Sequence, residues 1–331
     1  MATILSKGDL LHAVAQAVNE CGWNISYLND EHPFRVMISR GTEFFRAKII
    51  IYNCTHGGGR MRAADEYRIQ LKINRLDHER GYKTLILGYY EPLNVFAGWD
   101  INKHLGPVGY SASFQIQEEN LERASLSGLS PCDKGNGEIA IAFRPDLFVE
   151  YALNLEDFHA FGRSQKDLRI LAEVAETEVV PNTAMINEVA ASRRTALITL
   201  SKKLRDNSFR ARVLRAYNYR CAFSGMQLRL VDAAHILPVS DSRSTDETSN
   251  GIALSSIYHK AYDKGLITFS DKYKIIINEA EIARLRGMNL DGGIQKFRSD
   301  IRPIIDVPPA VSDRPNVAYV LAANKLRGWK T

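Results

Sequence analysis

The chain has 331 residues and a net charge of +5, with 45% hydrophobic and 24% charged residues. This length accommodates two domains with separate cores, and the composition is typical of soluble globular proteins. We find no secretory start and no apolar run of roughly 18 residues, so neither secretion nor a membrane span is supported, and the cytoplasm is the expected location. The four widely scattered cysteines indicate reduced, buried thiols rather than a disulfide framework.

Residues 1–165 are expected to form a mixed α+β domain. A helix is predicted from about Asp9 to Glu20, and Gly22 follows it as a stop signal. Later runs rich in β-branched and aromatic residues predict strands at Phe34–Arg40, Phe44–Cys54, Glu66–Asn74, Lys83–Glu91, Asn94–Asp100, Tyr110–Gln117 and Glu138–Arg144. Because few helical patterns separate these runs, a curved, mostly antiparallel sheet is favoured over a doubly wound one. A second helix is predicted to start at Pro145.

Residues 166–205 combine acidic residues, Pro181 and a basic block, and we interpret them as a helical basic connector rather than a core. Residues 206–331 form the second predicted domain, whose first helix is capped by Asp206, Asn207 or Ser208. An apolar stripe follows on this helix, made of Phe209, Val213, Leu214 and Tyr217.

Positive charge is concentrated around this domain boundary. Residues 192–220 carry nine basic side chains against the single acid Asp206, a net charge of +8, so the rest of the chain sums to −3. Such a block is expected beside a polyanionic substrate, and Arg210, Arg212 and Arg215 are candidate DNA contacts. The alternative is a solvated helical face with an excess of basic residues.

Four residues in the second domain suit metal-assisted phosphodiester hydrolysis. His235, Asn250, His259 and Asp263 are separated by fifteen, nine and four residues, in a stretch that reads as strand, loop and helix. A neutral imidazole accepts a proton from water near pH 7, and an amide can fix the flanking loop. A His and an Asp four residues apart share one helix face, so both can reach one divalent ion. Taken singly, each histidine fits a structural role better, with His235 as a core residue and His259 on the helix surface, and it is the ordered set of four that favours the site.

The same stretch resembles the HNH endonuclease family, in the branch common among restriction-type enzymes. The resemblance covers residues 206–278 and is carried by Ala233-Ala-His235-Ile-Leu-Pro238, Asn250-Gly251 and His259-Lys-Ala-Tyr-Asp263-Lys-Gly265. It implies a ββα-metal fold, flanked here by helices, in which a two-stranded hairpin and one helix hold a single divalent cation. It also implies that His235 is the general base, that Asn250 orients this base and its loop, and that His259 and Asp263 bind the metal.

The sequence departs from the family pattern at two places. Ala234 stands where many relatives have a metal-binding His or Asp, which leaves two ligands on the helix. Waters and phosphate oxygens would then complete the coordination shell, and such a shell favours Mg²⁺, with Mn²⁺ as the alternative. Asp232 lies two residues earlier, on the same side of a strand, and is a candidate replacement ligand. Cys221 is followed by Ser224 instead of a second cysteine, so no structural zinc is predicted.

Specificity is expected to reside in residues 1–165, as recognition of a DNA sequence or of a modified base. A glycine-rich segment lies between two predicted strands, and Arg60, Arg62 and Arg68 in and after it are candidate contacts to phosphate or guanine. The alternative is that this segment is simply a flexible hairpin loop. Aromatic residues could stack on an extruded base or simply fill the core, and the candidates are Trp23, Tyr89, Tyr90 and Trp99.

These observations predict a metal-dependent endonuclease that cuts double-stranded DNA in restriction or phage defence, possibly in a modification-dependent manner. Because one active site cuts one strand, a homodimer is expected, and Tyr273–Asn278 and Ala318–Leu326 are its candidate contacts or else plain core. Two alternatives stay open at this point. One is a non-catalytic DNA-binding protein with an HNH fold, and the other is a structure-specific, homing or RNA nuclease.

Overall fold

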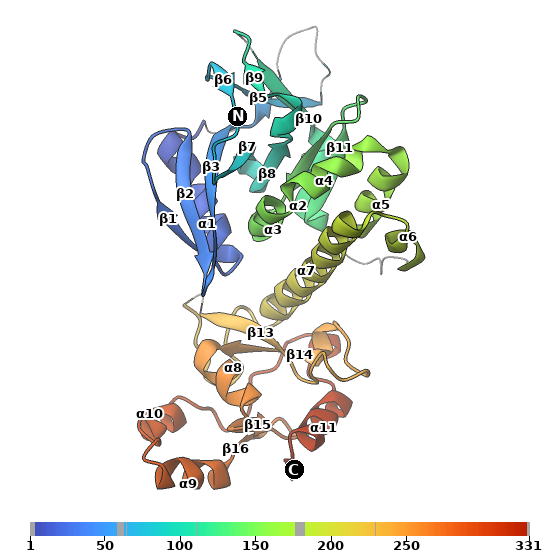
Figure 1. The fold of residues 1–331 in the computed structure, drawn as a ribbon. Coiled ribbons are helices and arrows are strands. Elements are labelled where there is room, and N and C mark those ends of the chain that lie inside the picture. Colours follow the sequence, from blue (N-terminus) through green and yellow to red (C-terminus); the bar gives the residue numbers. More distant parts are fainter. Residues whose placement is uncertain are drawn as a thin grey trace. The chain divides into compact units, whose positions relative to one another are not determined.

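The computed structural model describes residues 4–57, 63, 65–110, 112–175, 183–228 and 230–329, and Figure 1 shows its helices and strands. The chain divides into two compact units, Met1–Leu204 and Arg205–Thr331, hereafter the N-terminal and C-terminal units. Both contain helices and strands, so the predicted α+β class is confirmed. Within the described residues, no helix combines the length and the apolar character needed to span a membrane.

The N-terminal unit is built on a sheet with the strand order β1-β2-β3-β7-β8-β12-β11. Its strands are β1 (Asn24–Tyr27), β2 (Phe34–Arg40), β3 (Glu43–Asn53), β7 (Lys83–Tyr90), β8 (Val95–Trp99), β11 (Leu129–Asp133) and β12 (Ile139–Phe143). The pair of β3 and β7 is parallel and the other neighbours are antiparallel, which confirms a mostly antiparallel sheet.

Each face of this sheet packs into its own hydrophobic core, because successive side chains of a strand point to opposite sides. Ile49 and Ile51 of β3 belong to one core and Ile50 to the other. The first core also takes in α1 (Lys7–Glu20), whose N-terminus is closed by a capping box between Ser6 and Asp9. The second core takes in α2 (Glu118–Ser127) and parts of a small sheet of β4 (Thr55–His56), β5 (Glu66–Gln70) and β10 (Ser113–Gln117). A further short pair joins β6 (Arg75–Leu76) to β9 (Gly106–Pro107).

The residues interpreted as a connector contribute to the first core. After α3 (Phe148–Leu153) and α4 (Leu155–Ala160), helix α5 (Gln165–Ala175) buries Ile170, Leu171, Val174 and Ala175 in it. This apolar spacing places all four side chains on one helix face, so α5 covers the core as an ordinary amphipathic helix. A short helix, α6 (Thr183–Asn187), then precedes α7.

Helix α7 runs without interruption from Ala191 to Ala216. The predicted helix start at Asp206, Asn207 or Ser208 is therefore wrong. These residue types favour caps, but here strong helix formers flank them and neither Gly nor Pro interrupts the helix. Beyond Arg205, the predicted apolar stripe is buried in the core of the C-terminal unit.

The C-terminal unit contains the predicted hairpin and helix. Strands β13 (Val231–His235) and β14 (Gly251–Ser255) are antiparallel, and α8 (Ser256–Asp263) follows β14 directly. A second strand pair, β15 (Ile267–Phe269) with β16 (Ile275–Ile277), comes next. Three helices complete the unit: α9 (Glu279–Gly287), α10 (Ile294–Ser299) and α11 (Val317–Leu326). Cys221 is buried in this core, where it packs as a small apolar residue.

Candidate nuclease site

The hairpin register brings His235 beside the start of β14. His235, the last residue of β13, pairs with Gly251, the first residue of β14. Asn250 immediately precedes this strand, and its carbonyl oxygen accepts a hydrogen bond from the Ile236 amide at 2.8 Å. Because α8 begins one residue after β14, the hairpin also fixes where the helix residues His259 and Asp263 emerge.

Gly251 is required by the close approach of α7 to the hairpin. A Cβ atom at this position would lie 2.2 Å from Cγ2 of Val213, 3.1 Å from Cζ of Phe209 and 3.1 Å from the carbonyl oxygen of Thr248. The shortest of these distances is far inside van der Waals contact, and only glycine fits without a shift. The glycine after Asn250 therefore lets the buried face of α7 rest against the strand end that carries His235.

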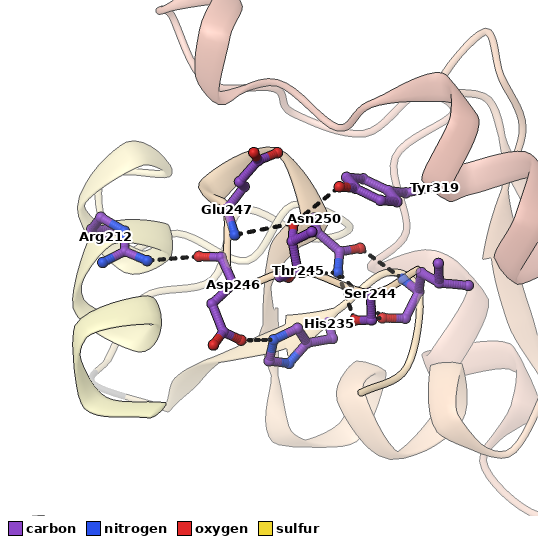
Figure 2. A network of polar contacts seen from close by, with 9 residues as sticks. Arg212, His235, Ser244, Thr245, Asp246, Glu247, Asn250 and Tyr319 are labelled. Atoms are coloured by element: carbon purple, nitrogen blue, oxygen red, sulfur yellow. Dashed lines mark hydrogen bonds and ion pairs between the residues drawn. The ribbon is translucent and has the colours of Figure 1, made fainter. Parts of the chain in front are cut away.

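The His235 ring is held on one face and at one nitrogen. Phe209 of α7 stacks on it, with ring centroids 3.8 Å apart and an interplanar angle of 10°. Nε2 of His235 lies 3.0 Å from Oδ1 of Asp246, in the loop between the two strands, as Figure 2 shows. The side chain of His235 is 17% exposed, so it is largely enclosed and still accessible to water.

Asn250 fixes the loop that connects β13 to β14. Its side chain is fully buried, and its Oδ1 accepts a hydrogen bond from the Leu237 amide at 2.9 Å. Its Nδ2 donates to Oγ of Ser244 at 3.0 Å and to the carbonyl oxygen of Thr245 at 2.9 Å (Figure 2). One amide side chain thus joins two segments of the loop. Thr245 directly precedes Asp246, so this bond also holds the residue that contacts His235.

The backbone just beyond His235 is held from the opposite side. The Ile236 carbonyl oxygen accepts hydrogen bonds from the Tyr262 hydroxyl at 3.3 Å and from Nη1 of Arg327 at 3.0 Å. Burial raises the pKa of Tyr262 to about 12, so this hydroxyl remains a donor at neutral pH. The Arg327 guanidinium lies over the Tyr262 ring, 4.4 Å from its centroid. A residue after α11 therefore supports the strand that carries His235.

His259 and Asp263 lie on the same face of α8. Nε2 of His259 is 3.7 Å from Oδ2 of Asp263, and the two side chains are 28% and 57% exposed. Two metal–ligand bonds of about 2.1 Å span at most about 4.2 Å, so one divalent ion fits between these atoms. A nitrogen and a carboxylate oxygen also form a suitable donor set for such an ion. Within the described residues, no group of three or more His, Cys, Asp or Glu residues is placed to hold a metal.

The two positions on β13 considered for a third ligand differ in what they contact. Ala234 is buried and carries no ligand atom. The Asp232 carboxylate, which the sequence offers as a replacement, is 2.6 Å from Nε of Arg210 and also accepts a hydrogen bond from the Ala233 amide. In this structure Asp232 is therefore an ion-pair partner of α7.

The candidate DNA-binding arginines are found in different settings. Arg210, Arg212 and Arg215 of α7 are exposed, and the first of these pairs with Asp232. Arg212 donates to the Asp246 carbonyl oxygen at 2.6 Å (Figure 2). It also donates to Oγ of Ser208.

In the N-terminal unit, Arg68 is half-buried on β5, whereas Arg60 and Arg62 lie outside the described residues. The aromatic candidates for base stacking are mainly part of the core, since Trp23, Tyr89 and Trp99 are all under 9% exposed. Tyr90 is half-buried, and its hydroxyl lies 3.4 Å from that of Tyr67.

Sequence reasoning missed three residues that contact the site: Asp246, Phe209 as a stacking partner of His235, and Arg327. Asp246 lies in a loop with several other polar residues, and Phe209 is recognisable in the sequence only as part of an apolar stripe. Arg327 is distant in sequence. Their proximity to His235 and Ile236 arises from the fold.

A hairpin that leads directly into a histidine-bearing helix is the arrangement of ββα-metal nucleases, and the C-terminal unit has this fold. Residues 221–270 match the sequence model of the HNH endonuclease family. The C-terminal unit therefore carries an HNH endonuclease domain.

Residues 45–152 match a second family, described as Methylase-associated X1. No curated protein matches the chain. A solved structure titled "Modification dependent TagI restriction endonuclease" is similar at 10% identity, over 87% of this chain and 82% of that one, with a TM-score of 0.29. We base no conclusion on a likeness of this degree.

Proposed function

We propose that the protein is a metal-dependent DNA endonuclease in which His235 is the general base and His259 and Asp263 bind one divalent ion. The observation that carries this proposal is the placement of three motif residues on the HNH hairpin and helix. His235 ends β13, Asn250 fixes the following loop from the start of β14, and α8 presents His259 beside Asp263.

The residues on α8 fit a hard, partly hydrated cation, because the described part of the chain offers two side-chain ligands here, and water and phosphate oxygens must complete the shell. Mg²⁺ is the proposed ion, with Mn²⁺ as the alternative. When bound, the cation supplies Lewis-acid stabilisation of the charge that develops on the phosphate and the departing 3′ oxygen. The protein's part is to hold these two ligands on one helix face, adjacent to the hairpin.

His235 is proposed to accept the proton of a water molecule as that water's oxygen bonds to phosphorus and the bond to the 3′ oxygen breaks. The stacked Phe209 ring limits the tilt of the imidazole, and the anchored Ile236 carbonyl limits movement of its backbone. Both restraints favour a fixed base, which proton transfer in a crowded site requires. Asn250 contributes by fixing the loop and does not itself act as an acid or base.

Double-stranded DNA is the proposed substrate and restriction or phage defence the proposed role. The exposed arginines of α7, Arg210, Arg212 and Arg215, supply sequence-independent attraction to phosphates beside the hairpin. Recognition of a sequence or a modified base is assigned to residues 1–165, and Arg68, Arg60 and Arg62 are the candidate contacts. Because each chain carries one such site, cutting both strands is proposed to require a homodimer in the cytoplasm.

The test is cleavage of supercoiled plasmid with Mg²⁺ or Mn²⁺, comparing the wild type with His235→Ala. Substrates are unmodified, cytosine-methylated, hydroxymethylated and phosphorothioated DNA, with an RNA control. We expect metal-dependent nicking or linearisation that His235→Ala abolishes, and a preference among the four DNAs. Equal cutting of all four would exclude modification dependence, and equal activity of His235→Ala would exclude its role as base.

DNA binding without cleavage is a second candidate, and a specific observation favours it. The metal ligand that many relatives place at position 234 is absent, and the nearby carboxylate of Asp232 is paired with Arg210. A binder would retard each DNA in a gel-shift assay and leave every plasmid intact at all metal concentrations. Any metal-dependent nicking that requires His235 rejects this candidate.

A further inference from the structure

The carboxylate of Asp246 contacts the imidazole of His235. What we infer from this contact rests on the proposed function, because the contact holds the proposed base. The Asp246 carboxylate lies 3.0 Å from Nε2 of His235, which is hydrogen-bond distance. The Phe209 ring lies parallel to the imidazole at 3.8 Å. Stacking restricts the plane of the ring, whereas the carboxylate selects which edge of the ring faces the loop.

Asp246 is itself fixed by its neighbours, so its contact with His235 is a built arrangement. Nη2 of Arg212 donates to the Asp246 carbonyl oxygen at 2.6 Å. Directly before it, the Thr245 carbonyl oxygen accepts from the buried Asn250 side chain at 2.9 Å, and Oγ1 of Thr245 lies 2.9 Å from the Tyr319 hydroxyl (Figure 2). The loop segment around Asp246 is thus anchored to α7, to the start of β14 and to α11.

This contact determines which nitrogen of His235 can accept a proton. An ionised carboxylate only accepts hydrogen bonds, so Nε2 of His235 must donate to Asp246. A neutral imidazole has one N–H group, and the other nitrogen, Nδ1, then carries the lone pair. Within the described part of the chain, Nδ1 has no hydrogen-bond partner, so it is the nitrogen left for water.

We propose that Asp246 is a positioning residue that holds His235 with its proton on Nε2 and its lone pair on Nδ1. In the cleavage step, Nδ1 takes the proton of the attacking water, and the imidazolium that forms has an N–H on each nitrogen. Asp246 stays ionised and stabilises this cation through the existing hydrogen bond. Asn250 therefore orients the base indirectly, through Thr245 and Asp246.

The first test measures the tautomer directly and needs no DNA. Imidazole ¹⁵N shifts of the full-length protein, with the His235 signals assigned by their loss in His235→Ala, report which nitrogen is protonated. In the neutral imidazole, which is measured at about pH 8.5, we expect the Nε2–H form in the wild type. In Asp246→Asn the amide can donate as well as accept, so the Nε2–H form should lose its preference. An Nδ1–H form in the wild type overturns the proposal.

The second test measures cleavage of supercoiled plasmid with Mn²⁺ at saturating enzyme. We expect Asp246→Asn to lower the single-turnover rate roughly 10²-fold with unchanged DNA affinity, and Asp246→Glu, which keeps the carboxylate, to recover part of this loss. Asp241→Asn is the matched control, because Asp241 lies in the same loop and its carboxylate pairs with Arg243 instead of His235. It should cut at the wild-type rate.

The outcomes separate this inference from the proposed function. If His235→Ala is inactive and Asp246→Asn cuts like the wild type, the positioning role is rejected while the general base stands. Faster cleavage by Asp246→Asn, or a loss confined to DNA affinity, also rejects it. If His235→Ala retains full activity, the proposed function fails, and the tautomer measurement still decides whether Asp246 controls the ring.

Discussion

Replacing the buried Asn250 with alanine should loosen the loop between β13 and β14 and destabilise the C-terminal unit. The substitution removes hydrogen bonds to Leu237, Ser244 and Thr245 of 2.9, 3.0 and 2.9 Å and leaves the Leu237 amide without an acceptor. Each of the three bonds is worth about 1 kcal/mol, and a buried unsatisfied group adds about 1–3 kcal/mol, which gives a loss of about 4–6 kcal/mol. In a unit of this size, the midpoint temperature should fall by roughly 15–25 °C.

Differential scanning calorimetry of the full chain measures this shift in the transition of the C-terminal unit. Hydrogen exchange should show lost protection in residues 236–250 of the Asn250→Ala variant. Ser249→Ala is the matched control in the same turn, because its hydroxyl makes only a 3.4 Å contact with Glu247, and we expect a change within about 0.5 kcal/mol. If Asn250→Ala shifts the midpoint no more than Ser249→Ala, the hydrogen-bond network does not hold the loop.

Two further predictions concern α8 and the hairpin. His259→Ala and Asp263→Ala should each raise the Mn²⁺ concentration for half-maximal cleavage at least about 10-fold. Lys264→Ala is the control and should leave this concentration unchanged. Equal metal requirements in all three variants would show that His259 and Asp263 are not the metal ligands. Gly251→Ala should destabilise the C-terminal unit by about 1–3 kcal/mol, because its new Cβ would lie 2.2 Å from Cγ2 of Val213. A chemical denaturation midpoint equal to that of the wild type would show that α7 can move away at no cost.

The positions of seven strands in the N-terminal unit could be predicted from the sequence, whereas strand order could not. The run Phe34–Arg40 coincides with β2, because buried β-branched and aromatic residues alternate there with half-buried polar residues and Met37. No local pattern indicates that β3 pairs in parallel with β7. Strand β11 escapes prediction because it contains Pro131, which an edge strand such as this one tolerates.

The residues of the site also divide into those that the sequence predicts and those that only the fold brings together. His235, Asn250, His259 and Asp263 could be named from the sequence because their spacing follows a hairpin and one helix turn, and the match of residues 221–270 to the HNH family agrees with that spacing. Asp246 could not be named, since its position beside His235 depends on how a loop folds back. The residue types indicate the proposed chemistry, whereas the orientation of the side chains depends on tertiary contacts.

The buried Asn250 amide also makes the loop tip a practical place for a probe. It clamps the segment at Leu237 and at Thr245, so the exposed tip at Ser242 can change chemically without disturbing the strands on either side. All four native cysteines are buried. A fluorophore on Ser242→Cys would therefore attach selectively, and a change in its emission on adding duplex DNA would test the proposed substrate in real time.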